Sequence, residues 1–199
     1  MAQDSRRDAP RVHPETSQEW RAWLQSHHDD EPPGAWVVSW KRATGRPAVS
    51  YEALVEEALA FGWIDSTAAT VDDERSMLWF TRRRRGSGWA RSSKERIARI
   101  EADGRMTEAG RAMIEAARAD GSWTLLDDVE NLVVPPDLSV ALAGRAGARE
   151  QWEAFSPAVR RNILGWIAQA RRPATRADRI EETAARAAVG ERAHEQPRR

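Results

Sequence analysis

The sequence predicts an α+β protein in which a small three-stranded antiparallel sheet is packed by helices and followed by a helical C-terminal region. Two observations predict the sheet. Residues 35–41 alternate in the manner of a half-buried strand, and two further apolar segments, 63–66 and 77–82, flank an acidic loop. The third observation concerns residues 157–170, where apolar side chains recur at the spacing of one helix face.

The first predicted element is a short amphipathic helix that follows a polar tail. Residues 1–14 are polar, contain proline and are expected to be disordered. Thr16 and Glu19 form a capping box that marks the start of the helix, and the Pro-Pro-Gly turn at 32–34 ends it. The alternating strand at 35–41 begins directly after this turn.

The second predicted helix leads into the strand that carries the candidate site. Ser50 is its N-cap, and a stripe of apolar residues follows. Gly62 stands where a left-handed residue commonly ends a helix, so the segment WIDS, from Trp63, begins a new element. Because side chains alternate along a strand, Trp63 and Asp65 are expected on the same face. The strand at 77–82 is the expected antiparallel partner.

The remainder of the chain is predicted to be helical. Capping residues predict helix starts at Ser92, Thr107, Pro135, Ser156 and Thr175. The expected organisation is a disordered tail at 1–14, an α+β N-terminal domain at 15–130, a helical region at 131–190 and a disordered tail at 191–199.

Composition and charge argue against several classes of function. The chain has 199 residues, 41% of them apolar, and no apolar run approaches the roughly 20 residues of a membrane-spanning helix. It has no cysteine, so no disulfide is expected. The formal net charge is zero and the pI is about 6.9, whereas a dedicated nucleic-acid-binding domain usually has a pI above ~9. With no apolar signal segment at the start, we expect a cytoplasmic protein that has no membrane span and binds no nucleic acid.

The densest polar cluster lies on and after the predicted hairpin, and it predicts a ligand pocket. A carboxylate among indole rings loses hydration, and an arginine partner offsets that loss best through paired hydrogen bonds. We therefore expect Asp65 to accept a hydrogen bond from an arginine or a backbone N–H. The pocket would be walled by Trp63 and Trp89, with Ser87 beside them, and would bind a small anionic ligand. In the alternative interpretation, Asp65 only caps a turn or pairs with Arg83, and the tryptophans are core residues.

A second basic set surrounds the expected helix break at Pro173. Arg176 and Arg179 lie three residues apart and share a helix face. They could capture a phosphate or carboxylate at the N-terminus of the last helix. A salt-bridged corner between two helices is the alternative.

Catalytic, metal and nucleic-acid sites find weaker support. Asp65 and Asp72 could act as a hydrolase-like acid–base pair if their carboxyls lay ~5 to 10 Å apart. The His-His-Asp-Asp-Glu run at 27–31 offers possible metal ligands, but the chain has neither an HExxH motif nor a cysteine pair, so no metal or cofactor is expected. The segment GSGWA lacks the GxSxG pattern of a serine nucleophile. The arginine run at 82–85 could contact phosphates, but the zero net charge argues against it.

Four sequence blocks occur in an order that resembles one protein family. They are SYEALVEEALAFGWIDS, DDER…FTRRRRGSGWA, IEADGRMTEAGRAMIEAARADGSW and AQARRPATRADRI. Over residues 18–190 the chain resembles the YdeI/OmpD-associated family, also labelled OmdA-like or bacteriocin-protection proteins. Arg83 aligns with the arginine of that family's "PR" pattern and is therefore the preferred partner for Asp65.

The resemblance implies protection against bacteriocins or antimicrobial peptides and association with an outer-membrane porin, and it implies no established reaction. We therefore expect a bacterial, non-enzymatic binding or stress-protection protein. Its partner would be an unknown protein or a small anionic ligand, and it would use no cofactor. A small hydrolase-like enzyme using Asp65 and Asp72 is the alternative.

Overall fold

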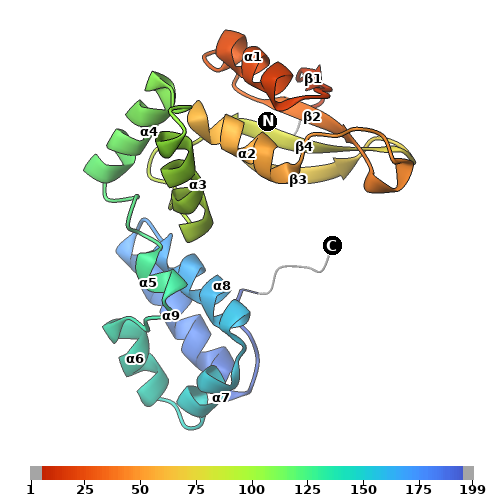
Figure 1. Ribbon diagram of the computed structural model, residues 1–199. Helices are drawn as coiled ribbons and strands as arrows, with labels where there is room; N and C mark the ends of the chain where they lie inside the picture. The colour runs from red at the N-terminus through yellow and green to blue at the C-terminus, as the bar shows by residue number, and fades with distance from the viewer. Residues whose placement is uncertain (1–5, 195–199) are drawn as a thin grey trace. The chain divides into compact units, whose positions relative to one another are not determined.

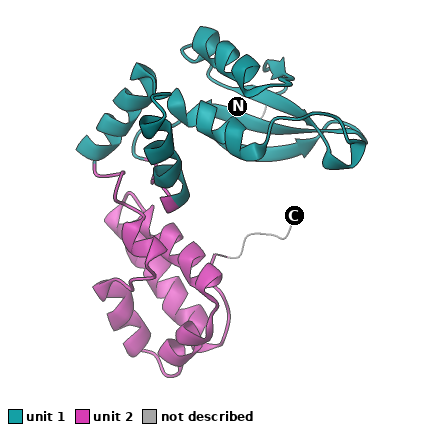
Figure 2. Cartoon of the chain, in the orientation of Figure 1, with its two compact units in different colours: residues 1–86, 92–120 teal, residues 87–91, 121–199 magenta. Residues whose placement is uncertain are grey.

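The computed structural model describes residues 6–194 and divides into two compact units (Figures 1 and 2). Unit 1 comprises Met1–Gly86 and Ser92–Asp120, and unit 2 comprises Ser87–Arg91 and Gly121–Arg199. Residues 1–5 and 195–199, at the ends of the two tails expected to be disordered, lie outside the described part of the chain.

Unit 1 is built on a four-stranded mixed sheet. The strands are β1 (Arg11–Val12), β2 (Ala35–Trp40), β3 (Trp63–Thr70) and β4 (Arg75–Arg82), in the spatial order β1-β2-β4-β3. Strand β4 runs antiparallel to both β2 and β3, whereas β1 runs parallel to β2. The predicted α+β class is confirmed, but the predicted three-stranded antiparallel sheet is incomplete.

The additional strand, β1, falls in the stretch that was expected to be disordered. Arg11 and Val12 pair in parallel with Trp36 and Val37 of β2. The backbone N–H of Trp36 donates to Pro10, and its indole N–H donates to the carbonyl oxygen of Arg6. The partners of β1 lie on β2, about 25 residues later in the chain, so local sequence patterns do not reveal the pairing. A strand of two residues is also too short to show alternation in the sequence.

Four α-helices and one 3₁₀ helix complete unit 1. The helices are α1 (Ser17–His27), α2 (Tyr51–Ala60), α3 (Arg91–Ala102), α4 (Glu108–Ala119) and the 3₁₀ helix η1 (Arg42–Thr44), with Arg91 grouped in unit 2. Thr16, Ser50 and Thr107 cap α1, α2 and α4 by accepting a backbone N–H three residues ahead, as the sequence predicts.

Helices α1 and α2 pack with the sheet around one core. The Trp20 ring lies 5.4 Å from the Phe80 ring of β4, and its indole N–H donates to the carbonyl of Leu54 in α2 at 3.1 Å. Phe80 is paired with Asp65 of β3, so the two side chains lie on the same face of the sheet. Asp65 and Trp63, two residues apart on β3, therefore lie on the same face, as predicted, and this face meets the helices.

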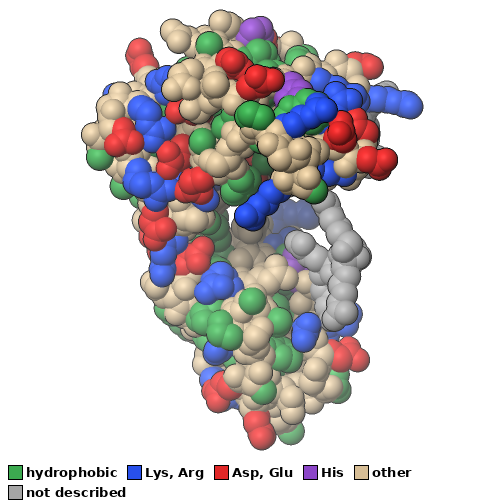
Figure 3. Space-filling model, turned by 45° about the vertical axis from the view of Figure 1, so that its right-hand side comes forward, with side chains coloured by type: hydrophobic (Ala, Val, Ile, Leu, Met, Phe, Trp, Pro, Cys, Tyr) green, Lys and Arg blue, Asp and Glu red, His purple; other side chains and the backbone are tan. Residues whose placement is uncertain are grey.

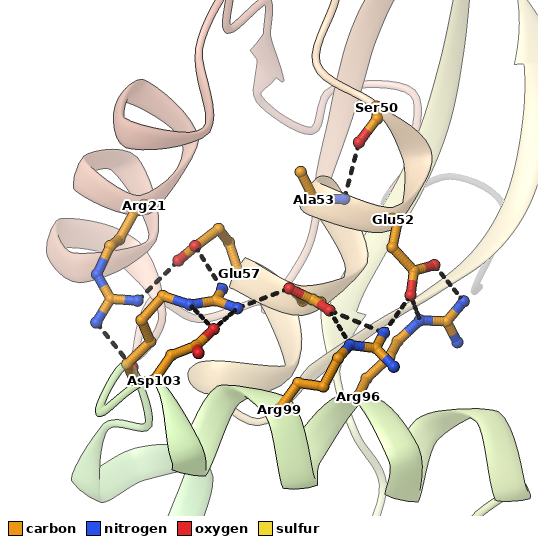
Figure 4. Close-up of polar contacts among 10 residues, drawn as sticks. Arg21, Ser50, Glu52, Ala53, Glu57, Arg96, Arg99 and Asp103 are labelled. Carbon is orange, nitrogen blue, oxygen red and sulfur yellow. Dashed lines mark hydrogen bonds and ion pairs between the residues drawn. The ribbon is translucent and has the colours of Figure 1, made fainter.

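Charged side chains of both signs are interspersed over the surface of unit 1 in the view of Figure 3. The most extensive ion pairs join α2 to α3 and to the segment that follows it (Figure 4). Glu57 is only 6% exposed and accepts from Arg21 at 2.7 Å and from Arg105 at 3.0 Å. Glu52 accepts from Arg96 at 2.7 Å. This network holds the helices of unit 1 together.

Unit 2 is helical throughout its described part, as predicted for the C-terminal region. Its helices are α5 (Asp127–Glu130), α6 (Pro136–Ala143), α7 (Ala148–Ala154), α8 (Pro157–Ala168) and α9 (Pro173–Ala188). The largest buried side chains of its core are Leu138, Leu142, Trp152, Ile163 and Ile167. Within residues 6–194, no helix has the length and apolar character needed to cross a membrane.

Candidate functional site

Asp65 lies at the start of β3 and has a different donor from the one expected. The hydroxyl of Tyr51, the first residue of α2, donates to Oδ2 of Asp65 at 3.1 Å. Burial and the neighbouring Asp65 carboxylate both raise the pKa of Tyr51, because each disfavours a phenolate there. The side-chain donor to Asp65 is thus a tyrosine hydroxyl. The prediction that an arginine or a backbone N–H would donate to this carboxylate was wrong.

The charge of Asp65 acts on the buried guanidinium of Arg83. Its side chain is buried at 8% exposure, and its backbone N–H donates to the carbonyl of Gly62 at 3.0 Å. Burial lowers the pKa of Arg83 to about 10, and the negative charge of Asp65 opposes that shift. The structure therefore brings Trp63, Asp65 and Arg83 into one region of unit 1.

The remaining members of the predicted pocket fall in the other unit. Ser87 and Trp89 belong to the segment 87–91, which is part of unit 2. Trp89 is 2% exposed, and its ring centroid lies 5.2 Å from that of Trp123 in the same unit. The predicted pocket residues are thus divided between the two units.

Asp72, the second carboxylate of the alternative catalytic pair, stabilises the turn between β3 and β4. It accepts the backbone N–H of Arg75 at 2.7 Å and the guanidinium of the same residue at 2.6 and 2.8 Å. The hydrogen bond from Arg75 lowers the pKa of Asp72. Asp65 is seven residues away along an extended strand, a separation of about 20 Å at ~3.3 Å per residue. The two carboxyls are too far apart to act on one bond.

The two arginines expected to capture an anion have separate structural roles in unit 2. Arg176 of α9 donates twice to Asp137 of α6, at 2.8 and 3.1 Å, and this pair lowers the pKa of Asp137. Arg179 donates to the carbonyl of Trp166 and lies over its indole ring, 4.9 Å from the centroid. For Arg176, the structure therefore agrees with the alternative interpretation, in which the arginine forms a salt bridge between two helices. Arg179 also lines a cavity of about 530 Å³ that includes Trp166 and His194.

A different cavity, in unit 1, is lined by three tryptophans. It has a volume of about 400 Å³. We call it the tryptophan cavity, and its lining residues are Asp8, Ala9, Pro10, Trp23, His27, Asp30, Glu31, Pro32, Pro33, Gly34, Trp63 and Trp79. They come from the chain before β1, from α1, from the loop that follows α1, and from strands β3 and β4.

The aromatic walls of the tryptophan cavity are held in fixed orientations. The indole N–H of Trp63 donates to the carbonyl of His28 at 3.1 Å. The Trp23 ring stacks on His27 at 4.5 Å and meets the Trp63 ring edge-on at 6.0 Å. The Nδ1 atom of His27 lies 2.8 Å from the carbonyl of Trp23, which fixes the imidazole as well. The walls are therefore formed before any ligand arrives.

Carboxylates are the charged groups that line the tryptophan cavity. Asp8, Asp30 and Glu31 all contribute to its lining and are exposed. Glu31 pairs with Arg82 at 2.8 Å, whereas Asp8 and Asp30 form no ion pair within residues 6–194. No lysine or arginine is among the lining residues. In the described part of the chain, no three histidine, aspartate or glutamate side chains are grouped so that they could hold a metal ion.

Sequence reasoning identified Trp63 but missed most of this cavity. Trp23 falls in the predicted amphipathic helix, which was given no site residue, and Gly34 was interpreted only as part of the turn that ends this helix. The cavity depends on the loop at 30–34 closing beside Trp79, and this is a long-range contact. The available signal was compositional, since ten tryptophans against one tyrosine and three phenylalanines is an unusual ratio.

Comparisons with known families match both parts of the chain. Residues 12–113 match the model described as Domain of unknown function (DUF8412), and residues 131–190 match the OmdA model, described as Bacteriocin-protection, YdeI or OmpD-Associated. No curated protein and no solved structure gives a significant match. The OmdA match confirms, for residues 131–190, the resemblance noted in the sequence over residues 18–190. The chain therefore belongs to the DUF8412 family over more than half of its length and carries an OmdA domain at residues 131–190.

Proposed function

We propose that this protein is a non-enzymatic binding protein of the OmdA, bacteriocin-protection type, and that its ligand enters the tryptophan cavity of unit 1. The observation that carries this proposal is a cavity of about 400 Å³ walled by Trp23, Trp63 and Trp79. Small-molecule sites typically have volumes of ~300 to 1,000 Å³, mostly apolar walls and a few polar groups. The tryptophan cavity has this composition.

Two further features support a binding role. The rings are already fixed by hydrogen bonds and stacking, so little side-chain entropy is lost when a ligand binds. Trp23 is half-buried and lines the cavity. The protective role rests on the description of the OmdA family that matches residues 131–190.

A thermal-shift screen tests the proposal. Wild-type protein is heated with fragments that are cationic, neutral or anionic, because a ligand present at 100 times its dissociation constant adds ~2.7 kcal/mol of stability. Each hit is repeated with Trp23→Leu and with Trp40→Leu as the matched control. Trp40 is another half-buried tryptophan of unit 1, packed under Arg46 at 4.2 Å, and it does not line the cavity.

We expect the stabilisation by hits to be lost in Trp23→Leu and retained in Trp40→Leu. The proposal fails if no fragment of any charge stabilises the protein. It also fails if the hits act equally on both variants, because the ligand would then bind elsewhere.

A further inference from the structure

We infer that the cavity of unit 2, with a volume of about 530 Å³, is a second ligand site and that it binds a small organic carboxylate. The site is additional to the tryptophan cavity of unit 1 and does not depend on it. It lies where helix α8 packs against α5 and α9 (Figure 1). The small anionic ligand expected from the sequence would thus bind in unit 2, away from Asp65.

Arg179 of α9 provides the first group that would recognise a carboxylate. One N–H of its guanidinium donates to the carbonyl of Trp166, and the guanidinium lies over that indole ring, 4.9 Å from the centroid. Arg179 forms no ion pair with any of residues 6–194. The contact with Trp166 therefore holds the side chain in place, and its other N–H groups are available to a ligand in the cavity that it lines.

Arg161 of α8 is the second cation of the lining. Its Nε atom is buried and lies 3.2 Å from Oε2 of Glu130, yet its guanidinium donates no hydrogen bond within the described part of the chain. A guanidinium presents paired N–H groups that match the two oxygens of a carboxylate. The ion pair with Glu130 thus positions Arg161 and leaves its hydrogen bonds to a ligand.

The charges of the lining match a single negative charge. Among the acidic side chains, lysines and arginines of the lining, Arg161 and Arg179 are positive and Glu130 is negative, so their charges sum to +1. A carboxylate balances this charge. A phosphate monoester carries about −1.5 to −2 at neutral pH, exceeds it and is repelled more strongly by Glu130. The lining therefore favours a carboxylate over a phosphate.

The rest of the lining is suited to an organic molecule. Leu126 and Val129 contribute apolar surface. Asn162 and Gln169 each donate one hydrogen bond from the amide nitrogen to a backbone carbonyl, at 3.3 and 3.1 Å, and each amide has a further N–H and an acceptor oxygen. The volume also lies within the ~300 to 1,000 Å³ of small-molecule sites. A carboxylate attached to an apolar body would use both parts of the lining.

Three probes that share one benzene ring test the class of ligand by isothermal titration calorimetry. Benzoate carries the carboxylate, benzamide is its neutral counterpart, and phenyl phosphate carries the larger charge. We expect benzoate to bind saturably and at least about tenfold more tightly than either, because paired, charge-assisted hydrogen bonds act on the carboxylate. In ¹⁵N-tryptophan-labelled protein, benzoate should shift the indole N–H signal of Trp166 and leave that of Trp63 unchanged.

Removal of one positive charge tests the role of Arg179. Arg179→Gln should weaken benzoate binding by at least about tenfold. Arg172→Gln is the matched control, because Arg172 is an exposed arginine of unit 2 that does not line the cavity, and its benzoate affinity should equal that of the wild type. Arg179→Lys keeps the charge without the planar fork and should fall between the wild type and Arg179→Gln. Urea melts establish that the variants are folded.

Neutralisation of Glu130 should strengthen binding. Glu130→Gln removes the like charge that meets a ligand carboxylate and releases Arg161 from its ion pair, so benzoate should bind about three- to tenfold more tightly. Glu150→Gln makes the same change at an exposed position of α7 and should have no effect. Loss of a purely structural ion pair would not raise the affinity for a carboxylate.

Several results would overturn the assignment. One is the absence of saturable benzoate binding, and another is benzamide or phenyl phosphate binding as tightly as benzoate. Shifts at Trp63 with none at Trp166 would place benzoate in the other cavity. Equal losses in Arg179→Gln and Arg172→Gln, or an affinity in Glu130→Gln no higher than in Glu150→Gln, would show that the cavity does not recognise the carboxylate.

Discussion

The ring of Trp79 lies directly against the backbone of Gly34, and no other residue fits there. A Cβ added to Gly34 would lie 2.2 Å from Cζ2 of Trp79, well below any normal contact. Gly34 also has a φ of +146°, which L residues with side chains rarely adopt. This single contact sets how closely the loop after α1 approaches the sheet, and so shapes one wall of the tryptophan cavity.

Gly34→Ala should therefore displace the Trp79 ring. We expect a loss of about 2 to 4 kcal/mol in the free energy of unfolding, from strain at the backbone and overpacking against the indole. Ligand binding in the cavity should be lost as well. Gly45→Ala is the control, since Gly45 also has a positive φ but no atom lies within 4 Å of its added Cβ. Urea melts that show equal losses for the two variants would contradict this account of Gly34.

Glu57 should be the most sensitive carboxylate of the ion-pair network. Glu57→Ala leaves Arg21 and Arg105 without their buried partner, and we expect it to cost about 2 to 3 kcal/mol. This is the lower end for a broken buried pair, because the arginine side chains are 32% and 29% exposed. Glu101→Ala, at an exposed position of α3, should change stability by less than ~0.5 kcal/mol. Denaturant melts that rank the two variants equally would contradict the structural role of Glu57.

Helix α8 provides a contrast between a core residue and a cavity-lining residue. Ile163 is 1% exposed, so Ile163→Ala should cost about 2 to 5 kcal/mol in the free energy of unfolding. Trp166 is only half-buried, stacks on His194 at 4.9 Å and lines the cavity of unit 2. We therefore expect Trp166→Ala to cost about 1 to 2 kcal/mol. A larger loss for Trp166→Ala than for Ile163→Ala in urea melts would be inconsistent with this packing.

The pair of Asp137 and Arg176 should make the stability of unit 2 depend on pH. The hydrogen bonds from Arg176 hold the pKa of Asp137 below its unfolded value, so the native state stabilises the carboxylate. This contribution is fully present above the unfolded pKa of ~3.9 and is lost as the pH falls through the lower, folded pKa. Because both groups are substantially exposed, it should be under ~1 kcal/mol.

Urea melts of the wild type and of Asp137→Asn between pH 7 and pH 2 measure this effect. The wild type should be more stable at neutral pH, and the difference should shrink below about pH 4. Asp178→Asn, at an exposed position of α9, is the control and should follow the wild type. If the stability difference between the wild type and Asp137→Asn grew as the pH was lowered, it would contradict a lowered pKa of Asp137 in the folded protein.

Much of the fold could be predicted from local sequence signals. Strand β1 is an element that such signals did not predict. Thr16, Ser50 and Thr107 were identified as caps because side-chain capping depends on residues three positions apart. Strand β1 and the short helix α7 (Ala148–Ala154) were not predicted. The two residues of β1 become a strand only through pairing with β2, and α7 follows Gly147, a residue that normally ends helices.

The candidate site was harder to predict for the same reason. The shared face of Trp63 and Asp65 follows from strand periodicity, and the structure confirms it. The donor to Asp65 is Tyr51, which reaches it only because α2 folds back onto β3. The tryptophan cavity requires loop closure at Gly34, and no local pattern specifies that closure.

A titration followed through the indole N–H signals of ¹⁵N-tryptophan-labelled protein tests the central claim most directly. The best hits of the fragment screen are added, and signals are assigned with single Trp→Phe variants. We expect saturable shifts for Trp23, Trp63 and Trp79, with Trp152 in the core of unit 2 unchanged. Saturable shifts confined to tryptophans outside the cavity, or no saturable shift with any ligand, would contradict the claim that this cavity is the binding site.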